Sequence, residues 1–400
     1  MQVSLIGMGC GSLALLTGAA REALRHAELV IGASRLLESL PEDCAAQRIA
    51  EYRPDAICAQ IKAHSERACC VLYSGDTGFY SGARGLLLRL REENIPARVL
   101  PGISSVQYFS AALGVPWQEW RLVSAHGTDC DAVCEVMNDR SVFFLTGGAL
   151  TPRELCQQLT QAGLGTLSVT VGENLSYPEE RIVTGTPEEF AQQTFAPLSV
   201  MLCQAAPQTK RMPSGISDDR FIRGKVPMTK QEVRAVLSGK LAVRPEETVW
   251  DVGGGTGSVS VELALAASRG RVYAVECSEE ACNLIRQNRE EFGVWNLAVV
   301  PGAAPESLEA LPAPDVVFVG GSKGKLEEIL DCVLRKNSAA RIGISAIAIE
   351  TLGNAVSALT ARGYRTEVVQ IAVSRSKPAG ALHLLMANNP TFLITGEPNV

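Results

Sequence analysis

Hydrophobic residues along this chain form short continuous runs, separated by stretches in which apolar residues recur every three to four positions. The continuous runs have the length of buried strands, and the longer stretches have the period of a helix packed on one side. This alternation predicts an α/β fold with a parallel sheet. In the second half the predicted strands are Thr248–Val252, Arg271–Glu276, Leu297–Pro301, Asp315–Gly320 and Arg341–Ala348. The predicted helices there are Ser258–Ala267, Ser278–Gly293, Lys325–Leu334 and Leu352–Arg362.

Two more extended runs, Glu367–Val373 and Leu382–Met386, follow the last predicted helix. The sequence Pro378-Ala379-Gly380 lies between them and is typical of a turn. We therefore expect a parallel sheet finished by an antiparallel hairpin at its edge. Ligands of such sheets bind beyond the carboxyl ends of the strands, which places residues 302–305, 320–323 and 345–350 around one cleft.

A seam near residue 206 divides the pattern. The apolar strand Leu198–Cys203 precedes it, and a stretch with three prolines and clustered charge follows it. On each side of residue 206 the chain begins a separate series of alternating strands and helices. We expect two domains, residues 1–206 and 207–400, with 207–225 serving as a linker and lead-in segment.

Composition narrows the class of protein. With 400 residues, 46% of them hydrophobic, and a net charge of −6, the chain is expected to be a soluble, well-cored protein that binds neither nucleic acid nor membranes. No apolar stretch approaches the roughly 20 residues of a membrane span, and the start shows no signal peptide. The twelve cysteines contain no C-x-x-C pair. They favour buried thiols in a reducing cytoplasm, with no metal site.

The sequence WDVGGGTG at residues 250–257 carries the clearest chemical signal. A strand runs into alternating glycines that open a helix, and Glu276 ends the next strand, where a carboxylate can accept both hydroxyls of an adenosine ribose. The dinucleotide fingerprint G-x-G-x-x-G requires a glycine where Ser258 stands. The spacing G-x-G-x-G, with Asp251 before it, instead resembles the S-adenosylmethionine site of Rossmann-like methyltransferases.

The second half resembles a more specific family. The runs PMTKQEVRA, DVGGGTGSVSVE, GAAPESL, VFVGGSKGKLEEIL and ISAIAIET are similar to the CbiT family, which methylates carbon 15 of a cobalamin precursor and decarboxylates its carbon-12 acetate. The family often has Asp at position 276 and an acid at position 303, where this chain has Glu and Ala. Glu350 is our candidate for moving a proton. The resemblance implies S-adenosylmethionine contacts from Thr229, Gly253, Gly254, Gly255, Thr256, Gly257, Glu276 and Ala304.

The first half contains VSLIGMGCGS, VLYSGDTGFYSG, VLPGISSVQ, VSAHG and VFFLTGG, each a strand that ends in small or polar residues. In this order they resemble the tetrapyrrole methylase superfamily, with two α/β lobes, and within it the CbiE family of carbon-5 methyltransferases. Cys10 and Thr77 stand where the superfamily usually has prolines. We interpret His126 as a structural loop residue. The resemblance implies a second S-adenosylmethionine site from Cys10, Ser74, Gly75, Asp76, Phe79, Ser104, Ser105, Leu145 and Leu175.

Together the two resemblances imply methylation of a precorrin or cobalt-precorrin ring at carbons 5 and 15, with decarboxylation, by a chain that forms homo-oligomers. Because such a ring carries several carboxylates, basic residues should surround each cleft. The candidates in the second half are Lys323, Lys325, Arg375 and Lys377. An NAD-linked oxidoreductase and a non-catalytic corrin-binding protein remain alternatives.

Overall fold

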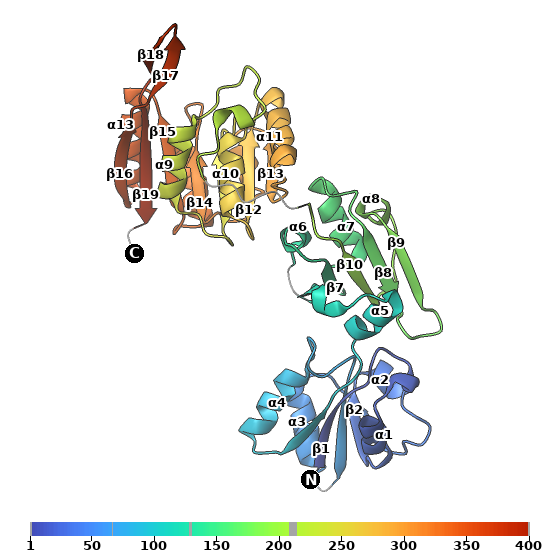
Figure 1. Cartoon of the computed structure of the whole chain (residues 1–400). Coiled ribbons are helices and arrows are strands. Elements are labelled where there is room, and N and C mark those ends of the chain that lie inside the picture. Colours follow the sequence, from blue (N-terminus) through green and yellow to red (C-terminus); the bar gives the residue numbers. More distant parts are fainter. Residues whose placement is uncertain (1, 66, 128–129, 208–213, 399–400) are drawn as a thin grey trace. The chain divides into compact units, whose positions relative to one another are not determined.

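The computed structural model describes residues 2–65, 67–127, 130–207 and 214–398 (Figure 1). The chain forms two compact units. The first comprises Met1–Cys130, Arg140–Thr160 and Gly165–Gln204, and the second comprises Asp131–Asp139, Gln161–Leu164 and Ala205–Val400. Residues 208–213 of the predicted linker lie outside the described residues, and the boundary at residue 206 stays a prediction.

The first unit begins with a five-stranded parallel sheet in the order β3-β2-β4-β1-β5. Alternate residues of β1 face opposite sides: Val3 and Leu5 pack with helices α3 and α4, whereas Ile6 and Met8 pack with α1 and α2. Figure 1 shows one helix pair on each side of this sheet. The strands are β1 (Gln2–Gly7), β2 (Leu29–Gly32), β3 (Gln47–Ala50), β4 (Ala68–Tyr73) and β5 (Ala97–Leu100), and the helices are α1 (Gly18–Arg25), α2 (Ser34–Glu38), α3 (Pro54–Ala63) and α4 (Ala83–Glu92).

The second sheet of this unit is mixed, in the order β6-β7-β10-β8-β9, with β6 and β7 parallel and the other pairs antiparallel. Its core is aromatic: the Trp120 and Phe143 rings stack with centroids 6.0 Å apart, and Phe109 lies against both. The strands are β6 (Arg121–Ser124), β7 (Val142–Leu145), β8 (Val169–Glu173), β9 (Arg181–Gly185) and β10 (Ser199–Cys203), and the helices are α5 (Ser105–Leu113), α7 (Pro152–Gln161) and α8 (Pro187–Phe190). Helix α6 (Ala132–Val136) groups with the second unit.

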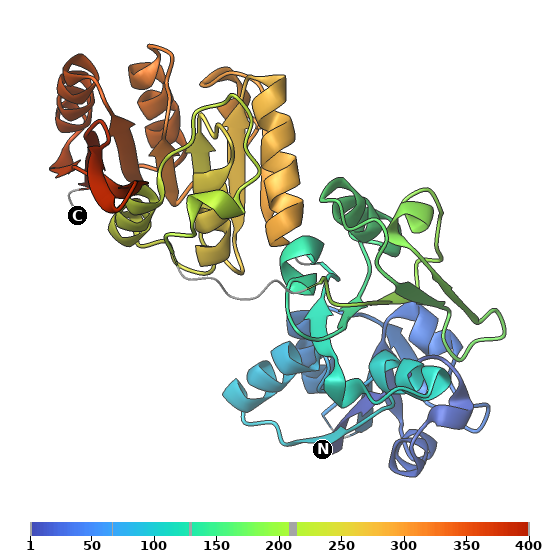
Figure 2. The ribbon, with the colours of Figure 1, turned by 45° about the horizontal axis from the view of Figure 1, so that its top comes forward.

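The second unit contains a seven-stranded sheet in the order β13-β12-β11-β14-β15-β19-β16. Helices α9, α10 and α11 cover one face and α12 and α13 the other, each over its own hydrophobic cluster. In Figure 2 the orange helix α11 lies alongside the strands of its unit. The first five strands are β11 (Thr248–Val252), β12 (Arg271–Glu276), β13 (Leu297–Pro301), β14 (Val316–Val319) and β15 (Arg341–Ala346), and the helices are α9 (Gln231–Leu241), α10 (Ser258–Ala266), α11 (Glu279–Phe292), α12 (Leu326–Lys336) and α13 (Ile349–Ala361). The predicted α/β fold is therefore confirmed, with three strands matched residue for residue. Short 3-10 helices lie at Leu13–Leu15, Trp117–Glu119, Asp218–Arg220 and Glu306–Leu308.

The predicted edge hairpin is wrong in its pairing. The run predicted as one arm is β16 (Tyr364–Ile371), which pairs with β19 (Thr391–Pro398), a strand that the sequence pattern did not reveal. Strand β19 inserts antiparallel between β15 and β16. The turn at Pro378-Ala379-Gly380 instead joins β17 (Ser374–Ala379) to β18 (Leu382–Ala387), which form a separate two-stranded sheet. Figure 1 shows this hairpin projecting beyond the end of the larger sheet.

Among the described residues, no helix is both long enough and apolar enough to cross a membrane.

Candidate functional sites

The turn after β11 is built for close backbone approach. Gly253 and Gly255 have φ values of +81° and +56°, in the left-handed region that side chains disfavour. A Cβ on Gly253 would lie 2.8 Å from the backbone of Gly321, and a Cβ on Gly255 would lie 3.2 Å from the carbonyl oxygen of Pro227. The glycines are therefore required both by conformation and by the backbone packed against them.

This turn forms part of the wall of a cavity of about 730 Å³ beyond the carboxyl ends of β11, β12 and β14. The three predicted cleft loops, after β13, β14 and β15, all contribute lining residues. The predicted cofactor residues that line the cavity are Thr229, Gly253, Gly254, Gly255, Thr256, Glu276 and Ala304.

Two predicted site residues lie elsewhere. Gly257 is the N-cap of α10, where a Cβ would meet Ile285 at 3.1 Å, so this glycine serves packing and does not line the cavity. Glu350 is exposed in the first turn of α13 and is also absent from the cavity wall. Its predicted role in proton transfer has no support from this geometry.

Glu276 is held in place by the backbone around it. Oε1 accepts the N–H groups of Cys277 and Ser278, at 2.8 and 2.9 Å, and Oε2 accepts that of Gly255 at 3.1 Å. Half-burial acts to raise the pKa of Glu276, but these hydrogen bonds outweigh it and hold the pKa below its ordinary value. An ionised carboxylate offers about four acceptor positions. Oε2 therefore keeps capacity for about one further donor, fewer than the two ribose hydroxyls expected from the sequence.

Asp251 lies at the floor of the cavity and is fully buried. Its Oδ2 accepts the hydroxyl of Ser260, while Oδ1 has no hydrogen-bond partner among the described residues. Burial raises the pKa of Asp251 to about 6, with a further contribution from the charge of Glu276, although the Ser260 hydroxyl acts in the opposite direction. The buried hydroxyl of Thr256 likewise has no partner in the described part of the chain. Buried polar groups usually have a hydrogen-bond partner, so these two atoms of the cavity wall can bond a bound molecule or a water.

Lysines surround the mouth of the cavity. Lys323 has a left-handed φ of +48°, and its Nζ lies 2.9 Å from the Sγ of Cys277. Lys325 also lines the cavity and pairs with Glu306 at 2.6 Å. Lys225 and Lys230 line it as well, although the sequence pattern did not single them out. The other two basic candidates, Arg375 and Lys377, lie on β17 outside the cavity wall.

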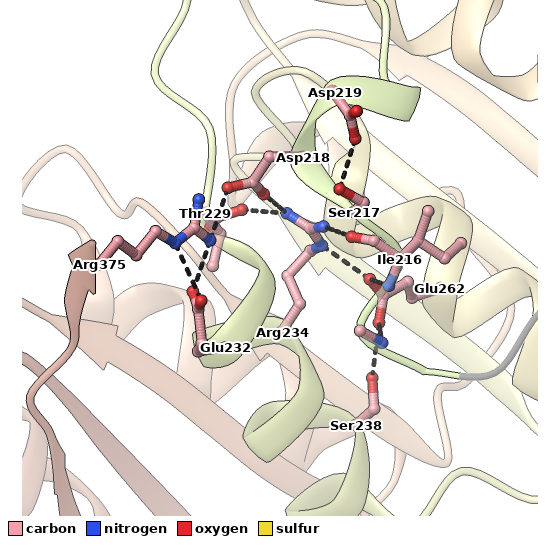
Figure 3. Close-up of polar contacts among 11 residues, drawn as sticks. Ile216, Ser217, Asp218, Asp219, Thr229, Glu232, Arg234, Ser238, Glu262 and Arg375 are labelled. Atoms are coloured by element: carbon pink, nitrogen blue, oxygen red, sulfur yellow. Dashed lines mark hydrogen bonds and ion pairs between the residues drawn. The ribbon is translucent and has the colours of Figure 1, made fainter. Parts of the chain in front are cut away.

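A buried ion cluster fixes the segment that carries Thr229 (Figure 3). The fully buried guanidinium of Arg234 bonds Asp218 at 2.9 Å and Glu262 at 2.7 Å, and it donates to the carbonyl oxygens of Thr229 and Ile216. Because Thr229 lines the cavity, the cluster sets the position of that wall. Hydrophobic periodicity could not have indicated it, since its members come from separate elements.

Arg375 joins this cluster from β17. Its guanidinium bonds Glu232 at 2.6 Å and Asp218 at 3.0 Å (Figure 3). These bonds, with Glu232 foremost, raise the pKa of Arg375 above its ordinary value although burial acts against them. The prediction that Arg375 surrounds the cleft is therefore wrong: its charge is used to tie the projecting hairpin to α9 and the preceding segment.

In the first unit, three strand-end turns meet backbone to backbone. A Cβ on Gly7 would lie 2.6 Å from the nitrogen of Gly102, and a Cβ on Gly102 would lie 2.3 Å from the carbonyl oxygen of Gly75. Cys10 follows in the β1 turn, where its thiol donates to the carbonyl oxygen of Ile103 at 3.3 Å. Burial raises the pKa of Cys10 to about 12, so this thiol is not a nucleophile near neutral pH.

The carboxylate of Asp76 and the side chain of Ser104 organise these turns. Asp76 accepts the N–H groups of Gly78 at 2.7 Å and Gly102 at 3.1 Å, which links the β4 turn to the β5 turn. Ser104 is the buried N-cap of α5 and forms a capping box with Gln107. Both residues therefore have structural roles where the resemblance places the cofactor.

The remaining predicted residues of the first unit divide into two groups. Phe79, Leu145 and Leu175 all pack in the aromatic cluster of the second sheet. Ser74 lies on the turn after β4 and accepts a hydrogen bond from Arg35 at 3.4 Å, and Ser105 is the first residue of α5. The imidazole of His126 lies in the loop after β6, where it would clash with a Cβ on Gly147.

The loop after β8 contains the predicted residue Leu175, but the sequence did not indicate its other contacts with the β1 turn. Ser176 accepts the N–H of Ser12 at 3.0 Å, and the ring of Tyr177 lies 2.1 Å from where a Cβ on Gly11 would be. Asn174 and Ser176 both have positive φ. The only available signal was the turn-forming composition that follows β8.

A second cavity, of about 780 Å³, opens beside these turns. Of the predicted cofactor residues, Phe79 lines it. The full lining is Thr77, Gly78, Phe79, Tyr80, Ser81, Arg84, Leu87, Leu88, Arg91 and Leu122.

Comparison with known proteins agrees with this division. The profile of the tetrapyrrole (corrin/porphyrin) methylases matches residues 2–191, and that of the precorrin methyltransferase domain matches residues 220–395. The chain is thus a methyltransferase with two different catalytic domains. It is 32% identical over 324 residues to the precorrin-6Y C(5,15)-methyltransferase (decarboxylating) of a Sinorhizobium species, covering 80% of this chain and 78% of the relative. The chain belongs to this family.

Other relatives match single halves. A probable cobalt-precorrin-6B C(15)-methyltransferase (decarboxylating) of Pyrobaculum calidifontis is 44% identical over 184 residues, which are 45% of this chain and 94% of the relative. The crystal structure of a precorrin-6Y C5,15-methyltransferase from Geobacter metallireducens is 40% identical and covers 46% of this chain and 96% of its own, with a TM-score of 0.44.

Proposed function

We propose that this chain uses S-adenosylmethionine to methylate a precorrin or cobalt-precorrin ring at carbon 5 in its first unit and at carbon 15 in its second. The second unit would also decarboxylate the carbon-12 acetate, releasing its carboxyl group as carbon dioxide and leaving a methyl group on the ring, in cobalamin biosynthesis. The observation that carries this proposal is the match to a C(5,15)-methyltransferase (decarboxylating) across both domains.

The cavity of the second unit fits such a cofactor. Glu276 has spare acceptor capacity toward a ribose hydroxyl, and the glycine turn permits close approach of a chain without phosphate. The unpartnered Oδ1 of Asp251 and hydroxyl of Thr256 provide further polar contacts at the cavity floor. When bound, the cofactor supplies a methyl group on positively charged sulfur.

The residues of the chain would mainly bind and orient. A reduced macrocycle provides its own carbon nucleophile, so the protein needs no covalent catalyst. Alignment of the two reactants away from bulk water supplies much of the rate. The lysines at the cavity mouth would bind carboxylates of the ring. This binding would orient the ring, so that one particular carbon faces the methyl donor.

The proposal is tested by incubating the purified full-length protein with precorrin-6Y and with S-adenosylmethionine that carries a carbon-13 methyl group. We expect a product that has gained two labelled methyl groups and lost carbon dioxide, with NMR placing the labels at carbons 5 and 15. Ring binding without consumption of the methyl donor would instead identify a corrin-binding protein. Hydride transfer to or from NAD would identify the oxidoreductase.

Assembly into homo-oligomers stays part of the proposal, and the projecting hairpin offers a surface for it. All residues of β18 are exposed, among them Leu382 at 68% and Leu385 at 75%. A cytoplasmic location is proposed from the abundance of thiols alone.

A further inference from the structure

Helix α4 carries an unusual outer face. It packs Ala83, Leu86 and Leu90 into the core of the first sheet. A neighbouring face of the helix carries two leucines flanked by two arginines, with the spacing i, i+3, i+4, i+7 that places all four on one side. The first leucine is half-buried against the same core, and the other three side chains are exposed. These residues are Arg84, Leu87, Leu88 and Arg91, and all four line the cavity of about 780 Å³.

The two arginines on this face have no acidic partner among the residues that the structure describes. On the same helix, Arg89 bonds Asp55 at 2.7 Å and Glu92 at 2.9 Å, and nearby Glu93 pairs with Lys62 at 2.6 Å. The acids near the end of α4 are therefore already paired. Within the described residues, neither guanidinium of the outer face forms an ion pair or a hydrogen bond.

Tyr80 also lines this cavity. Its backbone has a left-handed φ of +46°, a conformation that costs free energy for a residue with a side chain. Its hydroxyl donates to the carbonyl oxygen of Leu122 on β6 at 3.1 Å, the residue is 56% exposed, and its ring lies beside that of Phe79. This holds an aromatic surface open next to the apolar pair Leu87 and Leu88.

The geometry points to a binding surface for a flat, apolar ring that carries carboxylates at its edge. We propose that the ring substrate of the first unit lies against Tyr80, Leu87 and Leu88, with edge carboxylates held by Arg84 and Arg91. Guanidinium groups bind carboxylates through two parallel hydrogen bonds, so two arginines at a fixed separation would set the rotation of the ring as well as its position. The assignment rests on the proposed function, because it names the substrate surface of the carbon-5 reaction. Phe79 connects this surface to the turn of Asp76.

Steady-state kinetics of the full-length protein test this assignment. Replacing Arg84 or Arg91 by Ala should raise the KM for precorrin-6Y in carbon-5 methylation by about tenfold each, the usual effect of losing a charged hydrogen-bonding partner. Replacement by Lys keeps the charge but not the paired geometry, so it should give an intermediate increase. The KM for S-adenosylmethionine and the carbon-15 reaction should not change.

Arg89→Ala is the matched control, because it removes an arginine of the same helix whose charge is already compensated. An increase in KM for Arg89→Ala equal to that for Arg84→Ala would show a general charge effect and overturn the assignment. Unchanged KM values in a protein that methylates carbon 5 would also overturn it. A parent protein that fails to methylate carbon 5 would contradict the proposed function itself, and the assignment would fall with it.

Discussion

Replacement of Glu276 by Ala should weaken binding of S-adenosylmethionine to the second unit. The carboxylate already accepts three backbone N–H groups, which leaves about one acceptor position at Oε2 for a ribose hydroxyl. A hydrogen bond to a charged group contributes about 1.5–3 kcal/mol, which corresponds to roughly a ten- to hundredfold change in affinity. Since only one such bond fits, we expect an increase of about tenfold in the KM for the cofactor in carbon-15 methylation.

The assay follows both methylations in one reaction, so that carbon-5 methylation reports on the integrity of the preparation. Glu276→Gln should behave like the Ala variant, because its amide nitrogen cannot accept the bonds that Oε2 accepts. Glu279→Ala removes an exposed acid from the first turn of α11 and serves as control. If Glu276→Ala left the KM for the cofactor unchanged in a folded protein, the position assigned to the ribose would be wrong.

Three further outcomes are expected. Gly255→Val should stop carbon-15 methylation and spare carbon 5 in the mass assay, because its Cβ would meet a carbonyl oxygen at 3.2 Å in a left-handed turn. Asp76→Ala should abolish carbon-5 methylation by releasing two backbone N–H groups, and loss of carbon-15 methylation as well would indicate misfolding instead. Burial raises the pKa of Asp251 from 3.8 to about 6, so its stabilisation is complete below pH 3.8 and is lost as the pH rises through 6. Between pH 4 and 7 the free energy of unfolding of the parent protein should therefore fall by about 3 kcal/mol through this group, and that of Asp251→Asn should not. Denaturant unfolding measures both, and an identical pH dependence in the two proteins would contradict the shifted pKa.

The five parallel strands of the seven-stranded sheet could be predicted because each is a continuous apolar run closed by glycine or polar residues. The strand pairing at the edge of this sheet could not be predicted. The extended character of residues 367–373 was visible, but the partner of that strand depends on which edge remains open after the other strands have paired. Strand β19 occupies that edge. Its pairing there depends on the assembled sheet and cannot be predicted from a short stretch of sequence.

The features of the candidate site also differ in how far the sequence could predict them. The glycine turn and Glu276 were readable because a short local pattern carries the whole geometry. The pKa of Asp251, the left-handed backbone of Lys323 and the absence of Glu350 from the cavity depend on packing between distant segments. A charge such as that of Arg375 looks the same in sequence whether it faces solvent or completes a buried cluster.

The ion cluster around Arg234 also constrains how this sequence can diverge. It joins two guanidinium groups to three carboxylates drawn from the segment before α9, from α9 and α10, and from β17. Loss of one partner from a buried cluster leaves a charge without compensation, whereas coordinated replacement by apolar residues can be neutral. Single substitutions at the buried members Asp218, Arg234 and Glu262 should therefore be rejected unless their partners change with them. The Arg375–Glu232 pair is 41% and 39% exposed and should tolerate single changes, so the root of the hairpin can diverge while the cavity wall is conserved.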